Sequence, residues 1–389
     1  MCILHSQDNA KDPEAFKAAL QARWNQADQE FYDFRGVFFP GPFDPDEVFG
    51  SRQFNKPVDF TGSRFTEEAN FFLVNFTEGA NFSGATFREE GNFAGASIGG
   101  RVVFRVINPR DKAGRAPPFI GHFSGLEFQD RGVLRFQNTI LAHCTFTGTD
   151  LRRPEFQHVT WGAWRGRQII DDEASLSQEE KENPWFWDWF WAWVSGHLAL
   201  RTFALEIGHT ADTTGRDSIG TYLAEEPAPP EPPWGDKYGE VERLYRDLQE
   251  NYEKARDYKK MGDFHYGEME MHRRTNKWRW FLFYWYNLYW ALSGYGERPS
   301  RALGWLAGFL LALPLLVWGF GLDSAAGGTS PGFLETFTYI FEKATFQRPP
   351  RWSNLNLLGR FISNLSLLII PGQAALFLLA LRNRLGRRR

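Results

Sequence analysis

Cysteine is nearly absent from this sequence, with only Cys2 and Cys144 among 389 residues. Two thiols cannot build a disulfide framework or a cysteine-based structural metal site, so apolar packing must hold the fold together. The net charge is also small, at −3, which removes the general attraction to nucleic acid that a basic protein has. We therefore expect a protein with its soluble part in a reducing compartment, without a cofactor, a metal or a nucleic-acid partner.

Two further kinds of signal are missing. Residues 1–30 contain no apolar core flanked by basic residues, so no secretory signal is recognised and the N-terminal part should stay in the cytoplasm. The sequence also contains no nucleophile–base pairing, no phosphate-binding glycine loop and no metal-ligand spacing. We therefore predict that the protein is not an enzyme and assign it no catalytic residue.

Phenylalanine, in contrast, is abundant, with 37 residues that lie mostly in the first half of the chain. Between residues 49 and 104 an aromatic or aliphatic residue recurs at steps that alternate between five and six, so the period is eleven. Neither the 3.6-residue period of a helix nor the two-residue period of a strand explains this spacing. A fixed period of this length indicates a solenoid, in which stacked units share one apolar core.

Small residues stand two positions before many of these aromatics, as in Ala69-Asn70-Phe71 and Ala80-Asn81-Phe82. The pattern resembles that of pentapeptide-repeat proteins, and the interrupted array is similar to a Phe-rich branch of that family. The resemblance covers about residues 34–161, with an irregular insert at 107–118. It implies a right-handed, four-sided β-helix whose small and aromatic side chains point inward. Cys144 holds one of the small inward positions, so we expect a buried, unreactive thiol.

The middle of the chain is first acidic, then aromatic, then rich in proline. We interpret the acidic residues 171–180 as a solvated connection and the prolines of 224–234 as a stiff linker. Five tryptophans alternate with other residues in 185–193. They indicate a segment at the membrane interface or, as the open alternative, a segment buried against protein. The interface residues predicted here are Trp187, Trp189 and Trp191.

Residues 239–274 have apolar side chains at helical spacing, with a break near 257–262. This part looks like the single tetratricopeptide-type helical hairpin found ahead of the membrane segment in bacterial membrane-bound pentapeptide-repeat proteins. The aromatic stretch 278–292 follows it and is too short to cross a bilayer comfortably. We predict that it forms a helix along the cytoplasmic membrane surface, with Trp280 and Trp285 at the interface.

Two uncharged apolar runs of 21 residues, 302–322 and 361–381, are each long enough to cross a hydrocarbon core of about 30 Å. The second run has polar residues on one side of the expected helix, which should face protein or water. That side either lines a pore or holds helices together. Pro371 and Gly372 in mid-run suggest a hinge, with a passive kink as the alternative. The predicted pore-lining residues are Ser363, Ser366, Ile370 and Gln373.

The loop between the runs contains an apolar-aromatic helix candidate at 332–343, followed by an extended polar stretch. Span, short helix, extended segment and span resemble the pore-loop module of two-span cation channels. The potassium-channel filter sequence Thr-Val-Gly-Tyr-Gly is absent, so potassium selectivity is not implied. Basic residues are denser beside the runs than in the loop, which predicts cytoplasmic termini and an outside loop at 323–360. The candidates for a constriction are Glu342, Thr345 and Gln347.

These patterns predict a multidomain β + α protein of the bacterial inner membrane. We expect a helical cap at 1–30, a β-helix at 31–165, linkers with the Trp-rich segment at 166–235, a helical hairpin at 236–276, an interfacial helix at 277–297 and a two-span domain at 298–389. Our hypothesis is a homo-oligomeric ion channel, a tetramer or pentamer, that its cytoplasmic repeats assemble or gate and whose pore is lined by the second span. The alternative is a membrane-anchored scaffold whose repeats dock a protein partner without conducting ions.

Overall fold

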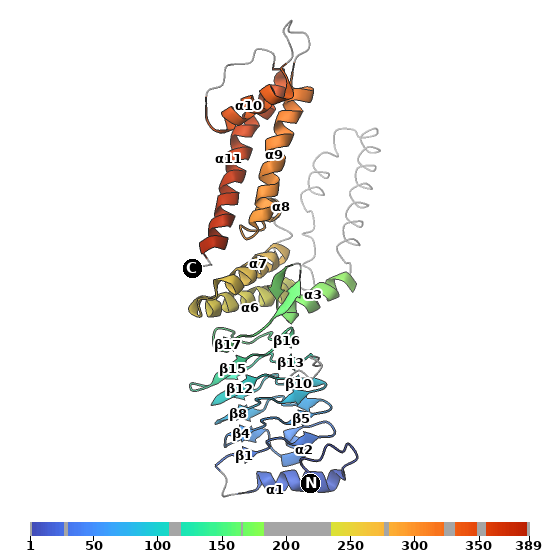
Figure 1. Ribbon diagram of the computed structural model, residues 1–389. Coiled ribbons are helices and arrows are strands. Elements are labelled where there is room, and N and C mark those ends of the chain that lie inside the picture. The colour runs from blue at the N-terminus through green and yellow to red at the C-terminus, as the bar shows by residue number, and fades with distance from the viewer. Residues whose placement is uncertain are drawn as a thin grey trace, which may run out of the picture. The chain divides into compact units, whose positions relative to one another are not determined.

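The computed structural model describes residues 2–26, 30–108, 118–164, 166–182, 235–275, 280–322, 331–347 and 355–386. The chain divides into two compact units, Met1–Asn251 and Tyr252–Arg389, which are drawn in Figure 1. The interface predictions for Trp187, Trp189 and Trp191 fall outside the described residues. Those predictions therefore stay untested.

The first unit is a stack of short parallel strands (Figure 1). Within the described residues the strands form four parallel sheets, in the orders β1-β4-β8-β12-β15-β17, β6-β10-β13-β16, β3-β7-β11-β14 and β2-β5-β9. The strands are β1 (Tyr32–Asp33), β2 (Phe38–Phe39), β3 (Gln53–Phe54), β4 (Val58–Asp59), β5 (Arg64–Phe65), β6 (Ala69–Asn70), β7 (Asn75–Phe76), β8 (Gly79–Asn81), β9 (Thr86–Phe87), β10 (Glu90–Asn92), β11 (Ser97–Ile98), β12 (Arg101–Arg105), β13 (Ile120–His122), β14 (Glu127–Phe128), β15 (Val133–Gln137), β16 (His143–Thr145) and β17 (Glu155–Gln157).

The strand register explains the eleven-residue period. Val58 pairs with Ala80, and Ala80 pairs with Val102, so residues 22 apart lie side by side in one sheet. We call these 22 residues one rung, and each rung contains two of the eleven-residue repeats. The next pair in this sheet, Val102 with Leu134, is separated by the sequence insert predicted at 107–118. The repeat thus sets which residues stack, and the insert lengthens one rung without breaking the register.

Ladders of stacked phenylalanines fill the interior of the stack. The ring centroids of successive members of one ladder lie 4.9–5.8 Å apart, close to the spacing of neighbouring strands. Five of its six rings are fully buried, and each buried phenylalanine contributes about 1.5–3 kcal/mol by leaving water. The predicted inward direction of the aromatics is confirmed. The ladder consists of Phe34, Phe60, Phe82, Phe104, Phe136 and Phe156.

The small residues before the aromatics also point inward. Ala69, Gly91, Gly121 and Cys144 occupy one column of paired positions. A Cβ atom added at Gly121 would lie 2.6 Å from a ring carbon of Phe123, so the ladder leaves no room for a larger side chain there. The side chain of Cys144 is fully buried, as predicted, and this burial raises the pKa of its thiol. The inert character predicted for Cys144 is consistent with its place in this column.

Helices cover the N-terminal end of the stack. Helix α1 (Pro13–Trp24) begins with Asp12, whose carboxylate accepts the Glu14 N–H as an N-cap. Its last residue, Trp24, stacks on Tyr32 and on Phe49 with centroid distances of 4.2 and 4.5 Å. Phe49 ends the short helix α2 (Pro45–Phe49). These contacts shield an end of the stack whose open strand edges would otherwise invite pairing with another chain.

At the other end of the strands, an antiparallel pair, β18 (Gly162–Trp164) and β19 (Arg167–Ile169), leads into helix α3 (Asp171–Glu182). The interpretation of this acidic stretch as a solvated connection is wrong at its start. Asp172 and Glu173 are buried, because Asp172 accepts the N–H groups of Phe146 and Thr147 and Glu173 pairs with Arg167. Both carboxylates are compensated by donors, which composition alone does not reveal.

The described chain from residue 235 onward is helical, and the second unit begins at Tyr252. Helices α6 (Gly235–Lys254) and α7 (Tyr258–Thr275) occupy the segment predicted as a hairpin, with a shorter break than expected. Three helices continue the chain, namely α8 (Trp280–Ser293), α9 (Pro299–Phe320) and α10 (Phe333–Ala344). The final helix, α11 (Leu357–Gly386), lies beside α9 and runs antiparallel to it (Figure 1). The described part of the chain therefore contains helices in every segment where the sequence predicts a span.

Two of these helices, α9 and α11, are long and apolar enough to cross a membrane. Only 17% of the apolar window of α9 and 22% of that of α11 is buried within the chain. A core helix of a water-soluble domain buries most of its apolar surface, so the exposure of both helices favours a lipid environment. The chain segments at the end of α9 and the start of α11 are in close contact, since a Cβ at Gly359 would lie 2.2 Å from the Gly321 carbonyl oxygen.

Candidate functional site in the membrane hairpin

The polar side of α11 faces the interior of its own unit. Ser363 and Ser366 are 0% exposed and Gln373 is 2% exposed, while Ile370 belongs to the apolar core beside them. The four predicted pore-lining residues therefore pack against helices of the same chain. Of the two readings that the sequence left open, this arrangement matches the one in which the polar side holds helices together.

Gln373 joins three helices through its side-chain amide. The Nε2 group donates hydrogen bonds to the Leu292 carbonyl oxygen at 3.1 Å and to the Ala302 carbonyl oxygen at 2.9 Å. Leu292 lies near the end of α8 and Ala302 lies in the first turn of α9. The Oε1 atom of Gln373 is buried and has no hydrogen-bond partner within the described residues. Gln373 thus fixes the turn by which the chain passes from α8 into α9.

A second polar cluster lies where α10 meets α11. The Lys343 ammonium donates to the Ser363 hydroxyl at 2.5 Å and to the Asn364 Oδ1 at 2.9 Å. The Ser366 hydroxyl donates to the Ser363 carbonyl oxygen at 2.8 Å, and the Lys343 Nζ lies 5.8 Å from the centre of the Tyr339 ring. Sequence reasoning missed this cluster, because Lys343 precedes Ser363 by 20 residues on another helix.

A lysine in contact with a serine is the pair that serine–lysine hydrolases use as base and nucleophile. In this chain the Ser363 side chain is fully buried and projects from the interior of a helix. A substrate carbonyl does not reach a hydroxyl in such a position. The geometry of the pair therefore supports a structural or ligand-binding role rather than catalysis.

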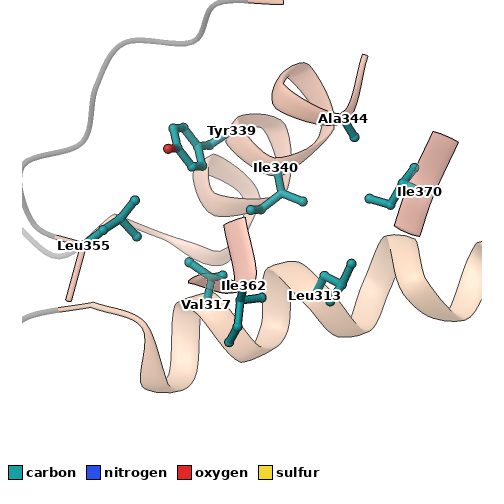
Figure 2. Packing of buried hydrophobic residues seen from close by; sticks show 8 residues of the cluster. All are labelled: Leu313, Val317, Tyr339, Ile340, Ala344, Leu355, Ile362 and Ile370. Carbon is teal, nitrogen blue, oxygen red and sulfur yellow. The ribbon is translucent and has the colours of Figure 1, made fainter. Parts of the chain in front are cut away.

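Helix α10 packs against both α9 and α11 through an apolar core. Figure 2 shows this cluster, with Tyr339, Ile340 and Ala344 of α10 lying over side chains of the two long helices. Beside this core α10 has a row of phenylalanines, Phe333, Phe337 and Phe341, with centroid distances of 6.5 and 6.2 Å, and Phe333 also packs against Trp318 of α9. Because Phe341 is exposed, this row continues the apolar surface of the long helices.

The three constriction candidates follow this row at the end of α10. Thr345 and Gln347 are exposed and Glu342 is half-buried. The Thr345 hydroxyl donates to the carbonyl oxygens of Phe341 and Glu342, within its own helix end. Among the described residues, no hydrogen bond connects these three side chains with α11. The structure therefore does not bring them together with the polar side of α11.

The hinge candidates and the interfacial tryptophans lie within helices. Helix α11 continues through Pro371 and Gly372 to Gly386. A Cβ at Gly372 would meet no atom within 4 Å, so close packing does not require the glycine within this chain. Trp280 and Trp285 lie in α8, as the sequence predicts, and their side chains are outside the described set.

The first unit has a groove of about 590 Å³ on the outer face of its six-stranded sheet. Acidic residues line it near β4 and β8, including Asp59 and Glu78, and basic residues line it near β12 and β15. Arg101 and Arg105 are exposed, and the Arg105 Nε donates to the Gln137 Oε1 at 2.6 Å. The groove therefore offers charges of both signs to a bound molecule.

Over the ranges that the structure describes, no group of three or more His, Cys, Asp or Glu side chains is placed to hold a metal ion. Comparison with known proteins gives no match to a family model, to a curated protein or to a solved structure.

Proposed function

We propose that this chain is a membrane-anchored scaffold, in which α9 and α11 hold the protein in a bilayer and the strand stack docks a protein partner. The observation that carries the proposal is the burial of Ser363, Ser366 and Gln373 against helices of the same chain. Side chains that already bond to their own chain are not available to line a water-filled path unless the helices separate. The outward surface of the hairpin is apolar, as an anchor requires.

The proposal includes the architecture and the orientation expected from the sequence. We take the four parallel sheets as the faces of a right-handed, four-sided β-helix of the pentapeptide-repeat type. The 22-residue register, with two eleven-residue repeats in each rung, supports this assignment. Basic residues beside α9 and α11 support cytoplasmic termini in a bacterial inner membrane. The groove on the six-stranded sheet is the candidate docking surface.

The decisive experiment measures ion current through the purified full-length protein in planar bilayers. A scaffold should give no current above that of protein-free bilayers. Gln373→Leu and Ser366→Leu should leave membrane insertion unchanged in a scaffold, since each removes only contacts within the helix bundle. Unitary currents that either substitution alters would contradict the scaffold and establish a conducting path along α11.

The second candidate is the homo-oligomeric ion channel. It is favoured by α10, which lies between the two long helices in the chain order of a pore-loop module and packs on both. The unpaired Oε1 of Gln373 adds a buried acceptor that a bound water or ion would satisfy. In that case subunits would assemble around α11 as a tetramer or pentamer, and the helices would separate to wet its polar side.

A further inference from the structure

We propose that the Lys343 ammonium, held in place by Ser363 and Asn364, binds the phosphate diester of a phospholipid headgroup. A lysine ammonium has three N–H donors. Two of them are used by Ser363 and Asn364, both neutral acceptors at 2.5 and 2.9 Å. No carboxylate of the described residues forms an ion pair with Lys343, so the positive charge and one donor remain for an anion.

The cluster lies near one end of the uncharged run of α11. Arg360 and Arg382 bound the uncharged run of α11, and they mark the two edges of the hydrocarbon layer. Ser363 follows Arg360 by three residues, which is about 4.5 Å along a helix. The ammonium therefore lies about one helical turn inside this edge, a depth from which lysine side chains near the ends of spans reach the headgroups.

The surroundings fit a lipid better than a free anion. Phe341 and Phe346 at the end of α10 and Phe361 on α11 are all exposed large apolar side chains. They flank the segments that hold the ammonium and offer contact to acyl chains. Arg360 is exposed and stands three and four residues before Ser363 and Asn364, on the same side of α11. A second cation is therefore available to the same phosphate.

The test counts lipids that stay bound to the purified full-length protein in native mass spectrometry. The protein is titrated with phosphatidylcholine, phosphatidylglycerol and diacylglycerol, which lacks phosphate. We expect the first phospholipid to bind about tenfold more tightly than diacylglycerol, the effect of one charge-assisted hydrogen bond. Lys343→Gln should remove this preference, and Lys343→Arg should retain it.

Two controls keep the result specific. Arg382→Gln removes a cation from the other end of α11 and should leave the phosphatidylcholine preference intact. Arg360→Gln changes an exposed side chain and should weaken phospholipid binding about threefold, even if Lys343→Gln proves unstable. The proposal is overturned if Lys343→Gln keeps the wild-type preference, or if 10 mM inorganic phosphate, roughly a physiological concentration, displaces the phospholipid. The latter result would identify a free-anion site.

Discussion

A single side chain completes the backbone hydrogen bonding at one end of the strand stack. The N–H groups of Phe71, Phe93 and Phe123 each donate to a carbonyl oxygen of the next rung. Among the described strands, none pairs with β16 beyond Phe146, and there the carboxylate of Asp172 accepts the Phe146 N–H at 3.1 Å. A carboxylate thus replaces the missing carbonyl and satisfies donors that would otherwise be buried without acceptors.

Asp172→Ala should therefore destabilise the first unit by about 1–3 kcal/mol, because the N–H groups of Phe146 and Thr147 lose their acceptor. Asp172→Asn keeps one acceptor oxygen and should cost less. Urea denaturation of the full-length protein, followed by circular dichroism, measures both values. Equal stability of the alanine variant and the wild type would show that water replaces the carboxylate.

A second buried carboxylate, Glu270 of α7, should make the stability of the fold depend on pH in the acidic range. Burial alone would raise the pKa of Glu270, but hydrogen bonds and charge from Arg273 and Arg274 outweigh burial and lower it. A lowered pKa means that this carboxylate stabilises the fold above its unfolded pKa, about 4.3. That contribution is lost as the pH falls through the lower folded-state pKa.

The melting temperature of the wild type should therefore fall as the pH is lowered from 5 to 3, because the unfolded pKa of glutamate, about 4.3, lies in this range. Glu270→Gln should melt lower than the wild type at pH 7, since it removes the carboxylate that pairs with the guanidinium groups of Arg273 and Arg274. The difference between the two proteins should shrink on acidification. A constant difference across this range would assign the acid sensitivity to other groups.

At the scale of elements, phenylalanines inside the ladder should contribute far more to stability than exposed phenylalanines nearby. Phe82 is 0% exposed and touches rings above, below and across the stack, whereas Phe72 is 42% exposed. Phe82→Ala should cost about 3–5 kcal/mol by opening a cavity in the ladder. Phe72→Ala is the matched control and should cost less than about 1 kcal/mol. Denaturant titration of both variants tests whether the ladder or general hydrophobicity stabilises the unit.

The sequence predicts the buried side of these elements but not their partners. The eleven-residue period identifies Phe71 and Phe82 as inward, because only a repeated core explains strict spacing. It does not reveal that Phe82 stacks on Phe60 and Phe104, since that requires the 22-residue rung. Asp172 and Lys343 were harder still, because their partners lie 25–26 and 20–21 residues away on other elements. The composition shows that a charged residue is present, but only the fold shows which group compensates its charge.

For the whole molecule, the apolar surface of α9 and α11 predicts how the protein is held in a membrane. Leu368 of α11 is 75% exposed, and a lysine at a lipid-facing position near the middle of a span costs about 2.5–3.5 kcal/mol. Leu368→Lys should therefore lower the fraction of protein that resists alkaline extraction from membranes. Phe72→Lys, at a 42% exposed position of the strand stack, is the control and should extract like the wild type.

The 22-residue rung also limits how this protein can change in length. Removing one whole rung would shorten the stack by about 4.8 Å, one strand spacing, and would keep every later residue on its own face. Removing a single eleven-residue repeat would shift every later residue by half a rung, to the opposite face of the stack. Each strand after the deletion would then stack on a different sheet from the one that it pairs with now. Lineages of this chain should accordingly gain or lose repeats in pairs.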